Sequence, residues 1–199
     1  MEYYPASIRN AIAHIATLPG IGQKTAERLV MHLLATDAAD VQALARSLIG
    51  LKEKVRLCRR CFSLSDEPMC AICRNPARQT GVLCVVEQPA DMVAIEKAGA
   101  FSGGYHILQG VLSPIDGIGP DAIRLRELFS RVAEESIQEV VVATGTSVEG
   151  EATAAFIARQ LSSSGIRVSR IASGVPMGGD LKFVDQVTLQ RAMERRHEL

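Results

Sequence analysis

Residues 82–99 read "VLCVVEQPADMVAIEKAG", an apolar run followed by a segment that begins with proline and ends with glycine. The run predicts a strand at 82–87, and the proline and glycine are typical of the two ends of a helix. The same alternation continues to residue 172, with strands expected at 105–110, 139–144 and 166–172 and helices at 120–136 and 151–165. Apolar strands that alternate with helices are typical of a parallel sheet covered on both faces, so the sequence predicts an α/β fold.

Acidic side chains follow two of these strands. Glu87 ends the first strand and is followed by Asp91, whereas Glu149 and Glu151 come after the third. Functional loops lie at the carboxyl ends of parallel strands, where converging carboxylates could hold Mg²⁺. The same acids also suit helix starts, because Glu149 stands three residues after Thr146, as in a capping box. The two roles are not exclusive, and both stay open.

A cysteine-rich stretch precedes the first strand. Residues 58–73, "CRRCFSLSDEPMCAIC", have the spacing C-x2-C-x8-C-x2-C, which directs four thiolates toward one point. We expect one structural Zn²⁺ per chain, with no position left for a catalytic water, held by Cys58, Cys61, Cys70 and Cys73. The alternative, two disulfides, requires an oxidising compartment, and nothing in the sequence signals export. Cys84, in an apolar run, is expected to be a buried strand residue.

The stretch "LPGIGQKTAERLVMHLL" at residues 18–34 places a Gly-x-Gly turn between two helical patterns. Those patterns are Ile8, Ile12, Ile15 and Leu18 before the turn and Ala26, Leu29, Val30 and Leu33 after it. A nucleotide P-loop is excluded, because it requires glycine directly before the lysine and Gln23 stands there. The N–H groups at a helix start suit a phosphate oxygen. The stretch therefore resembles a DNA-binding helix-hairpin-helix, with an ordinary helical hairpin as the alternative. Its candidate DNA contacts are Gly20, Gly22, Lys24 and Arg28.

Charge is distributed unevenly along the 199 residues. Residues 1–60 hold nine of the 22 Lys and Arg but only five of the 22 Asp and Glu, so the rest of the chain is acidic. DNA binding is therefore expected in the amino-terminal part, and the modest surplus favours several copies acting together. Apolar residues at 41, 44, 48, 51 and 55 form a stripe that packs either in the hairpin or against a partner copy.

The composition excludes some classes of protein. Tryptophan is absent and only 4% of the residues are aromatic, so base stacking is not an obvious binding strategy. There is no apolar run of membrane-spanning length and no signal region, so we expect a soluble, cytoplasmic protein without a membrane partner.

Several motifs together resemble the RecR family of bacterial recombination mediators over nearly the whole chain. They are, in order, "LPGIGQKTAERL", the cysteine stretch, "CVVEQPADMVAIE", "GGYHILQGVLSPIDGIGP", "VEGEATA" and "SRIASGVPMGGDLKFVDQVTL". The resemblance implies a helix-hairpin-helix region at 1–55, a C4 zinc finger at 56–79, a Toprim domain at 80–175 and a C-terminal segment at 176–199. It also implies a nucleoid-associated, ring-like tetramer around duplex DNA. This tetramer would act with RecO and RecF to help RecA replace single-strand binding protein at gaps.

The resemblance also assigns residues. Lys24 and Arg28 match DNA-contacting positions, and the four cysteines match zinc ligands. The acidic positions of Toprim domains are matched by Glu87 with Asp91 and by Glu149 with Glu151. For these acids the resemblance implies a role in partner docking, in which Mg²⁺ is optional. Two stretches depart from the family pattern. "ATGTS" at 143–147 stands where Ala-Thr-Asn-Pro-Thr is common, and Asp185-Gln186 stands where many members have Asp-Glu, which weakens a Walker-B-like interpretation of that segment.

The resemblance favours a protein without a catalytic residue. Catalytic Toprim domains have Asp-x-Asp where this chain has Glu-Gly-Glu. Strand cleavage also needs a nucleophile, usually a tyrosine, and no motif marks Tyr3, Tyr4 or Tyr105 for that role. The alternative is a Mg²⁺-dependent Toprim nuclease or a topoisomerase-like enzyme.

Overall fold

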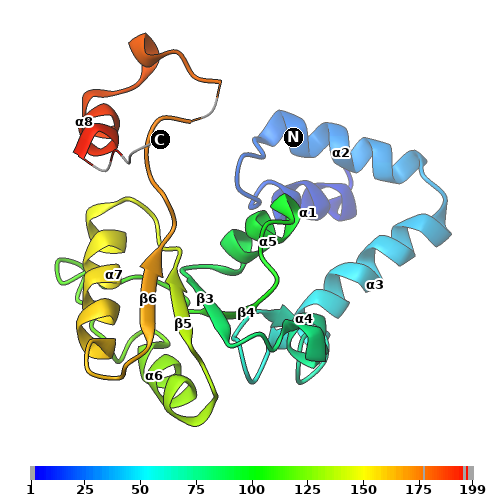
Figure 1. Cartoon of the computed structure of the whole chain (residues 1–199). Helices are drawn as coiled ribbons and strands as arrows, with labels where there is room; N and C mark the ends of the chain where they lie inside the picture. Colours follow the sequence, from blue (N-terminus) through cyan, green and yellow to red (C-terminus); the bar gives the residue numbers. More distant parts are fainter. Residues whose placement is uncertain (1–2, 177, 195, 197–199) are drawn as a thin grey trace. The chain divides into compact units, whose positions relative to one another are not determined.

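The computed structural model describes residues 3–176, 178–194 and 196, and the chain divides between Val55 and Arg56 into two compact units. The first unit contains helices α1 (Ala6–Ile15), α2 (Gln23–Ala35) and α3 (Ala38–Lys54) (Figure 1). The second contains the cysteine stretch, a parallel sheet and the C-terminal helix. None of the described helices is long and apolar enough to cross a membrane.

The first unit has a small core between α1 and α2. Ile12, Ala26 and Val30 are buried there, and Ile8 and Ile15 pack against them, as the helical spacing predicts. The expectation for Leu18 is wrong, because α1 ends at Ile15 and Leu18 lies exposed in the turn. No residue of α3 is buried, and the stripe residues Leu44, Leu48 and Leu51 are exposed, whereas Val41 and Val55 are half-buried.

The second unit is built on a four-stranded parallel sheet with the order β4-β3-β5-β6. Its strands are β3 (Val82–Val86), β4 (Gly104–Ile107), β5 (Glu139–Val142) and β6 (Arg167–Arg170). The helices that alternate with them are α5 (Pro89–Ala98), α6 (Leu125–Glu134) and α7 (Val148–Leu161). The predicted α/β fold is confirmed.

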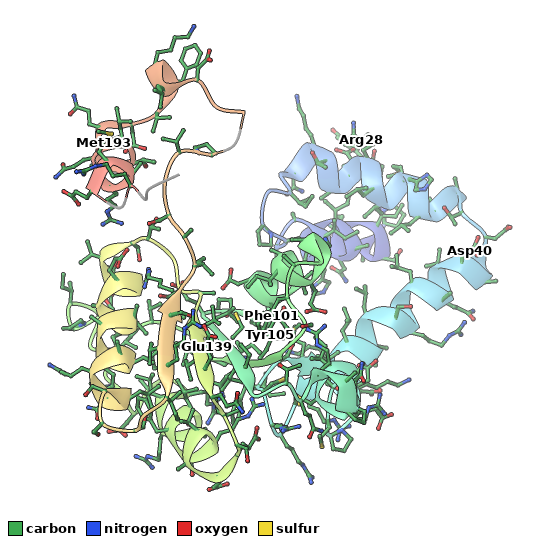
Figure 2. The ribbon with its side chains drawn as sticks, viewed as in Figure 1. Arg28, Asp40, Phe101, Tyr105, Glu139 and Met193 are labelled. Carbon is green, nitrogen blue, oxygen red and sulfur yellow. The ribbon has the colours of Figure 1, made fainter. Side chains whose placement is uncertain are left out.

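The two faces of the sheet have different covers. Leu83 and Val85 point into a core formed with α6 and α7. Cys84 and Val86 alternate with them, so they point to the opposite face, where α5 and the cysteine stretch pack. Figure 2 shows Phe101 and Tyr105 side by side on this second face, with ring centroids 5.1 Å apart. The cysteine stretch thus takes a place that a helix occupies in most doubly covered sheets.

The cysteine stretch forms a small finger of its own. It contains the antiparallel pair β1 (Arg56–Leu57) and β2 (Leu64–Ser65), the short helix α4 (Ala71–Arg74) and the turn η1 (Pro76–Arg78). After β6, the chain continues through η2 (Leu181–Phe183) to α8 (Gln186–Glu194) (Figure 1).

Several expected element boundaries need correction. The helix expected from residue 120 begins at Leu125, because the N–H of Arg124 donates to the Leu108 carbonyl and ties the preceding turn to the end of β4. The strand expected to reach residue 110 ends at Ile107, because Gln109 has a φ of 61°. The helix expected from Glu151 begins at Val148.

Candidate functional site

The α1–α2 turn presents the start of α2 to solvent. Gly20 has a φ of +78°, a conformation that suits glycine, and the N-cap residue Gly22 has no side chain to cover the helix start. The Gly22 carbonyl accepts from the Ala26 N–H at 2.9 Å and closes the first helical turn. The first N–H groups of a helix have no partner within it and lie at the positive end of its dipole. This geometry suits an anion such as a DNA phosphate.

Two basic side chains continue this surface. Lys24 and Arg28 are four residues apart on α2 and both are exposed, and Figure 2 shows Arg28 pointing away from α1. The acid between them, Glu27, accepts a hydrogen bond from the Tyr4 hydroxyl at 2.8 Å. That hydrogen bond holds the Glu27 carboxylate against Tyr4, whereas Lys24 and Arg28 have exposed side chains.

The four cysteines of the finger converge. Their ligand atoms all lie within 4.8 Å of one another, and the Sγ atoms of Cys61 and Cys70 are 3.5 Å apart. Tetrahedral Zn–S bonds of about 2.3 Å place neighbouring sulfurs about 3.8 Å apart, so the group fits zinc. The backbone N–H of Cys70 donates to the Sγ of Cys58, which stabilises a thiolate. These features support a structural zinc.

The finger is bonded directly to the sheet. The N–H of Ile107 on β4 donates to the Cys61 carbonyl at 2.8 Å. Arg60 pairs with Glu135 at the end of α6 at 2.9 Å, and Arg131 pairs with the same carboxylate at 3.0 Å. Burial by itself would raise the pKa of Glu135, but the two arginines outweigh it and hold this pKa below its usual value. The expectation that Cys84 is buried is confirmed, and burial raises its pKa to about 12, so its thiol stays protonated.

Two of the Toprim acids form bonds with the backbone. Glu87 accepts from the Gly145 N–H at 2.6 Å and so joins the ends of β3 and β5. Gly145 and Gly150 both lie close to this carboxylate, and a Cβ at Gly150 would meet the Gly145 carbonyl oxygen at 2.4 Å. Asp91 accepts from the Gln88 N–H at 2.8 Å in a capping box at the start of α5.

The other two acids lie in the first turn of α7. The capping box expected between Thr146 and Glu149 is wrong, because Ser147 is the N-cap residue and accepts from the Gly150 N–H. Glu151 lies 3.3 Å from Arg170 of β6 and 3.1 Å from Arg191 of α8. Arg170 also donates to the Gly145 carbonyl at 2.9 Å. The arginines make the carboxyl edge of the sheet a mixed-charge network.

This network changes what the Toprim edge can bind. Among the described residues, the four cysteines form the one group of three or more potential ligands close enough for a metal ion. The structure therefore supports zinc and lends no support to Mg²⁺. Sequence reasoning missed Arg170 and Arg191 as partners of Glu151, because pairs 19 and 40 residues apart leave no local pattern.

Tyr105 is unsuited to act as a nucleophile. Tyr105 is fully buried, and burial together with its hydrogen bond to Glu96 raises its pKa. A raised pKa keeps a phenol protonated and weakens it as a nucleophile.

A helix-hairpin-helix unit, a four-cysteine finger and a Toprim-type sheet together define one class of modular protein. Family models match the chain in that order: the RecR helix-hairpin-helix at 8–51, the RecR four-cysteine zinc finger domain at 55–75, the Toprim domain at 81–172 and the RecR C-terminal model at 174–197.

Curated relatives are similar to this chain over nearly its full length. Recombination protein RecR of Desulforapulum autotrophicum is 61% identical, with 98% of each chain covered. Those of Desulfosudis oleivorans and Thermobifida fusca are 58% and 48% identical over 98% of each chain. The chain belongs to the RecR family of recombination proteins.

Proposed function

We propose that this protein is a non-enzymatic, DNA-binding adaptor of recombinational repair in the cytoplasm. It acts with RecO and RecF and promotes the loading of RecA at gaps in duplex DNA. The main support is the α1–α2 turn, where an open helix start lies next to exposed Lys24 and Arg28. We use 1–55, 56–79, 80–175 and 176–199 as working domain limits.

The Toprim edge serves protein contacts in this proposal. Asp91 caps its own helix, Glu87 is bonded to Gly145, and Glu151 is paired with two arginines. A Toprim nuclease or topoisomerase-like enzyme would instead need carboxylates free for Mg²⁺ and an accessible nucleophile. We expect no cleavage of labelled DNA with Mg²⁺. Turnover that disappears in Glu87→Gln would establish the enzymatic alternative.

DNA binding in this proposal depends on assembly. One hairpin offers few phosphate contacts, so a single copy binds weakly, in the range of roughly 10⁻⁴ to 10⁻⁶ M. The exposed stripe of α3, where Leu44, Leu48 and Leu51 are 47–59% exposed, supports self-association. A ring-like tetramer would present several hairpins to one duplex and gain affinity through effective concentration.

The test compares two double variants by fluorescence anisotropy on duplexes of unrelated sequence. Lys24→Ala with Arg28→Ala should weaken binding to all duplexes alike and lower the salt slope by about two per bound chain. Arg9→Ala with Arg46→Ala removes the same charge from exposed positions of the same unit and should leave the slope unchanged. Equal losses in both variants would show that general charge, not the hairpin, binds DNA.

A further inference from the structure

Glu151 shares one carboxylate oxygen between two cations. Arg170 and Arg191 both approach Oε1, at 3.3 and 3.1 Å, and the three side chains are only 20–34% exposed. Two positive charges on one acid leave a local surplus of +1. The two arginines repel each other in this partly shielded site. Removal of one arginine therefore costs less free energy than removal of the only positively charged partner of an acid.

The two arginines are held very differently. Arg170 is anchored on a strand and also donates to the Thr144 hydroxyl at 3.2 Å and to the Gly145 carbonyl at 2.9 Å. The Arg191 guanidinium makes its hydrogen bond and its ion pair with Glu151 alone, within the described part of the chain. Arg191 is therefore the exchangeable ligand, and Arg170 is the fixed one.

The helix that carries Arg191 is loosely attached. No residue of α8 is buried: Val187 and Met193 are about 60% exposed, and Leu189 and Ala192 are half-buried. Thr188 and Asp185 form the cap of α8 itself, so their hydrogen bonds do not tie it to the sheet. The ion pair between Arg191 and Glu151 is the polar contact that the described residues show between α8 and α7.

Open space borders this contact. A cavity of about 440 Å³ is lined by Thr146 of the β5–α7 loop, by residues 172–174 and by α8 residues that include Arg191. The space next to Arg191 is therefore not filled by side chains of the described residues. A side chain from another protein can approach here without unfolding the sheet.

We propose that α8 is a built-in competitor for the Toprim edge: Arg191 occupies Glu151 until a partner protein presents its own arginine or lysine there. The occupant seen in the structure defines the chemistry of the partner, a guanidinium or ammonium on a protein surface. This proposal rests on the proposed function, because it takes RecO as the docking partner.

The first test needs no partner. Amide hydrogen exchange of residues 186–194 is measured in Arg191→Gln, Glu151→Gln and Arg191→Lys. An ion pair of this exposure holds roughly 1 kcal/mol, so the two glutamine variants should exchange about five-fold faster, whereas Arg191→Lys stays near wild type. Arg167→Gln, which removes a 74% exposed arginine of β6, is the charge control. If Arg191→Gln leaves the hydrogen exchange of residues 186–194 unchanged, the Arg191–Glu151 contact does not hold α8 in place and the proposal is overturned.

The second test measures affinity for purified RecO. Release of Glu151 in Arg191→Gln should tighten binding about three- to five-fold, the factor that corresponds to the lost competitor. Glu151→Gln should weaken binding. If Arg191→Gln binds RecO equally or more weakly while Glu151→Gln loses affinity, Arg191 does not compete with RecO, but RecO still docks at Glu151. If the affinity for RecO is unchanged in Glu151→Gln, RecO does not dock at this edge, and the proposed docking function is overturned instead.

Discussion

Gln109 and Phe62 both have left-handed backbone conformations, with φ of 61° and 63°, and they are hydrogen-bonded to each other. The Gln109 side-chain amide donates to the Phe62 carbonyl at 2.6 Å and joins the end of β4 to the finger. Non-glycine residues adopt this conformation at a cost of about 1–2 kcal/mol. The Phe62 ring is held as well, because it packs edge-on against His106 and lies 5.1 Å from the Arg124 guanidinium. The finger is therefore fixed to the sheet at two strained positions.

Substitution of Gln109 separates the hydrogen bond from the strain. Gln109→Ala loses the bond and keeps the unfavourable φ, so it should destabilise the second unit by about 2 kcal/mol. Gln109→Gly also loses the bond but relieves roughly 1 kcal/mol of backbone strain, so its loss should be about half as large. Urea unfolding of the zinc-loaded protein measures both values. Equal losses would show that the φ of Gln109 carries no strain.

Zinc removal should affect the sheet as well as the finger. We expect one Zn²⁺ per chain by metal analysis and impaired folding in Cys58→Ser, because structural zinc supplies folding free energy. Since the Ile107 N–H donates to the Cys61 carbonyl, amides of β4 should exchange faster after chelation, whereas α7 on the other face should change little. Folded, metal-free protein with two disulfides would contradict the zinc centre.

His106 should make the protein sensitive to mild acid. Burial lowers its pKa to about 4, against 6.5 in the unfolded chain, so the unfolded state takes up a proton first as the pH falls. The free energy of unfolding should therefore drop by about 2 kcal/mol between pH 7 and pH 5 from this residue alone. His106→Gln keeps a donor for the Arg124 carbonyl but does not titrate, so its profile should be flatter. Parallel profiles would remove His106 as the cause.

The same substitution should have opposite effects at two helical glycines. A Cβ at Gly150 would meet the Gly145 carbonyl oxygen at 2.4 Å and Glu87 at 3.0 Å, so Gly150→Ala should destabilise the second unit by more than about 2 kcal/mol. Gly50 in α3 has no atom within 4 Å of that position, so Gly50→Ala should stabilise by roughly 0.5–1 kcal/mol. Thermal unfolding measures both, and a stabilised Gly150→Ala would contradict the close approach at Glu87.

The stripe of α3 should control assembly. Leu48→Glu with Leu51→Glu places charges on exposed apolar positions, so the fold of the unit should survive while the mass by light scattering falls. Affinity for duplex DNA should fall with the mass, because the hairpins would then act singly. Leu34→Glu, at a 68% exposed position of α2 outside the stripe, is the control. A monomer that binds as tightly as wild type would contradict the multivalent clamp.

The features that the sequence predicted correctly are local ones. The cysteine spacing placed four thiolates together, and the apolar run around Cys84 predicted a buried strand, because each pattern lies within a few residues. The class of fold followed from repeated alternation. Helix starts were less predictable, since Ser147 and Thr146 are adjacent residues with equivalent hydroxyl groups and only the geometry of the loop selects the cap.

The contacts that connect elements could not be read from the sequence. Arg170 is expected only as a strand residue, and its bonds to Thr144, Gly145 and Glu151 depend on how β6 pairs with β5. The short strand at 104–107 likewise reflects the bond between Gln109 and Phe62, which are 47 residues apart. Pairing register and finger placement decide such contacts, and neither has a local signature.

The packing of the finger on the sheet also sets how fast its metal can be exchanged. Its cysteines are at most 8% exposed and lie in one apolar cluster with Val86, Tyr105 and Ile107. A chelator can reach the metal only when this cluster opens, so the rate of zinc loss should saturate with chelator concentration at the opening rate. The same packing limits zinc binding in a newly made chain, because zinc must reach the cysteines before the apolar cluster closes around them. The fraction of protein that carries zinc should therefore depend on the zinc available during synthesis as well as on the affinity of the folded site.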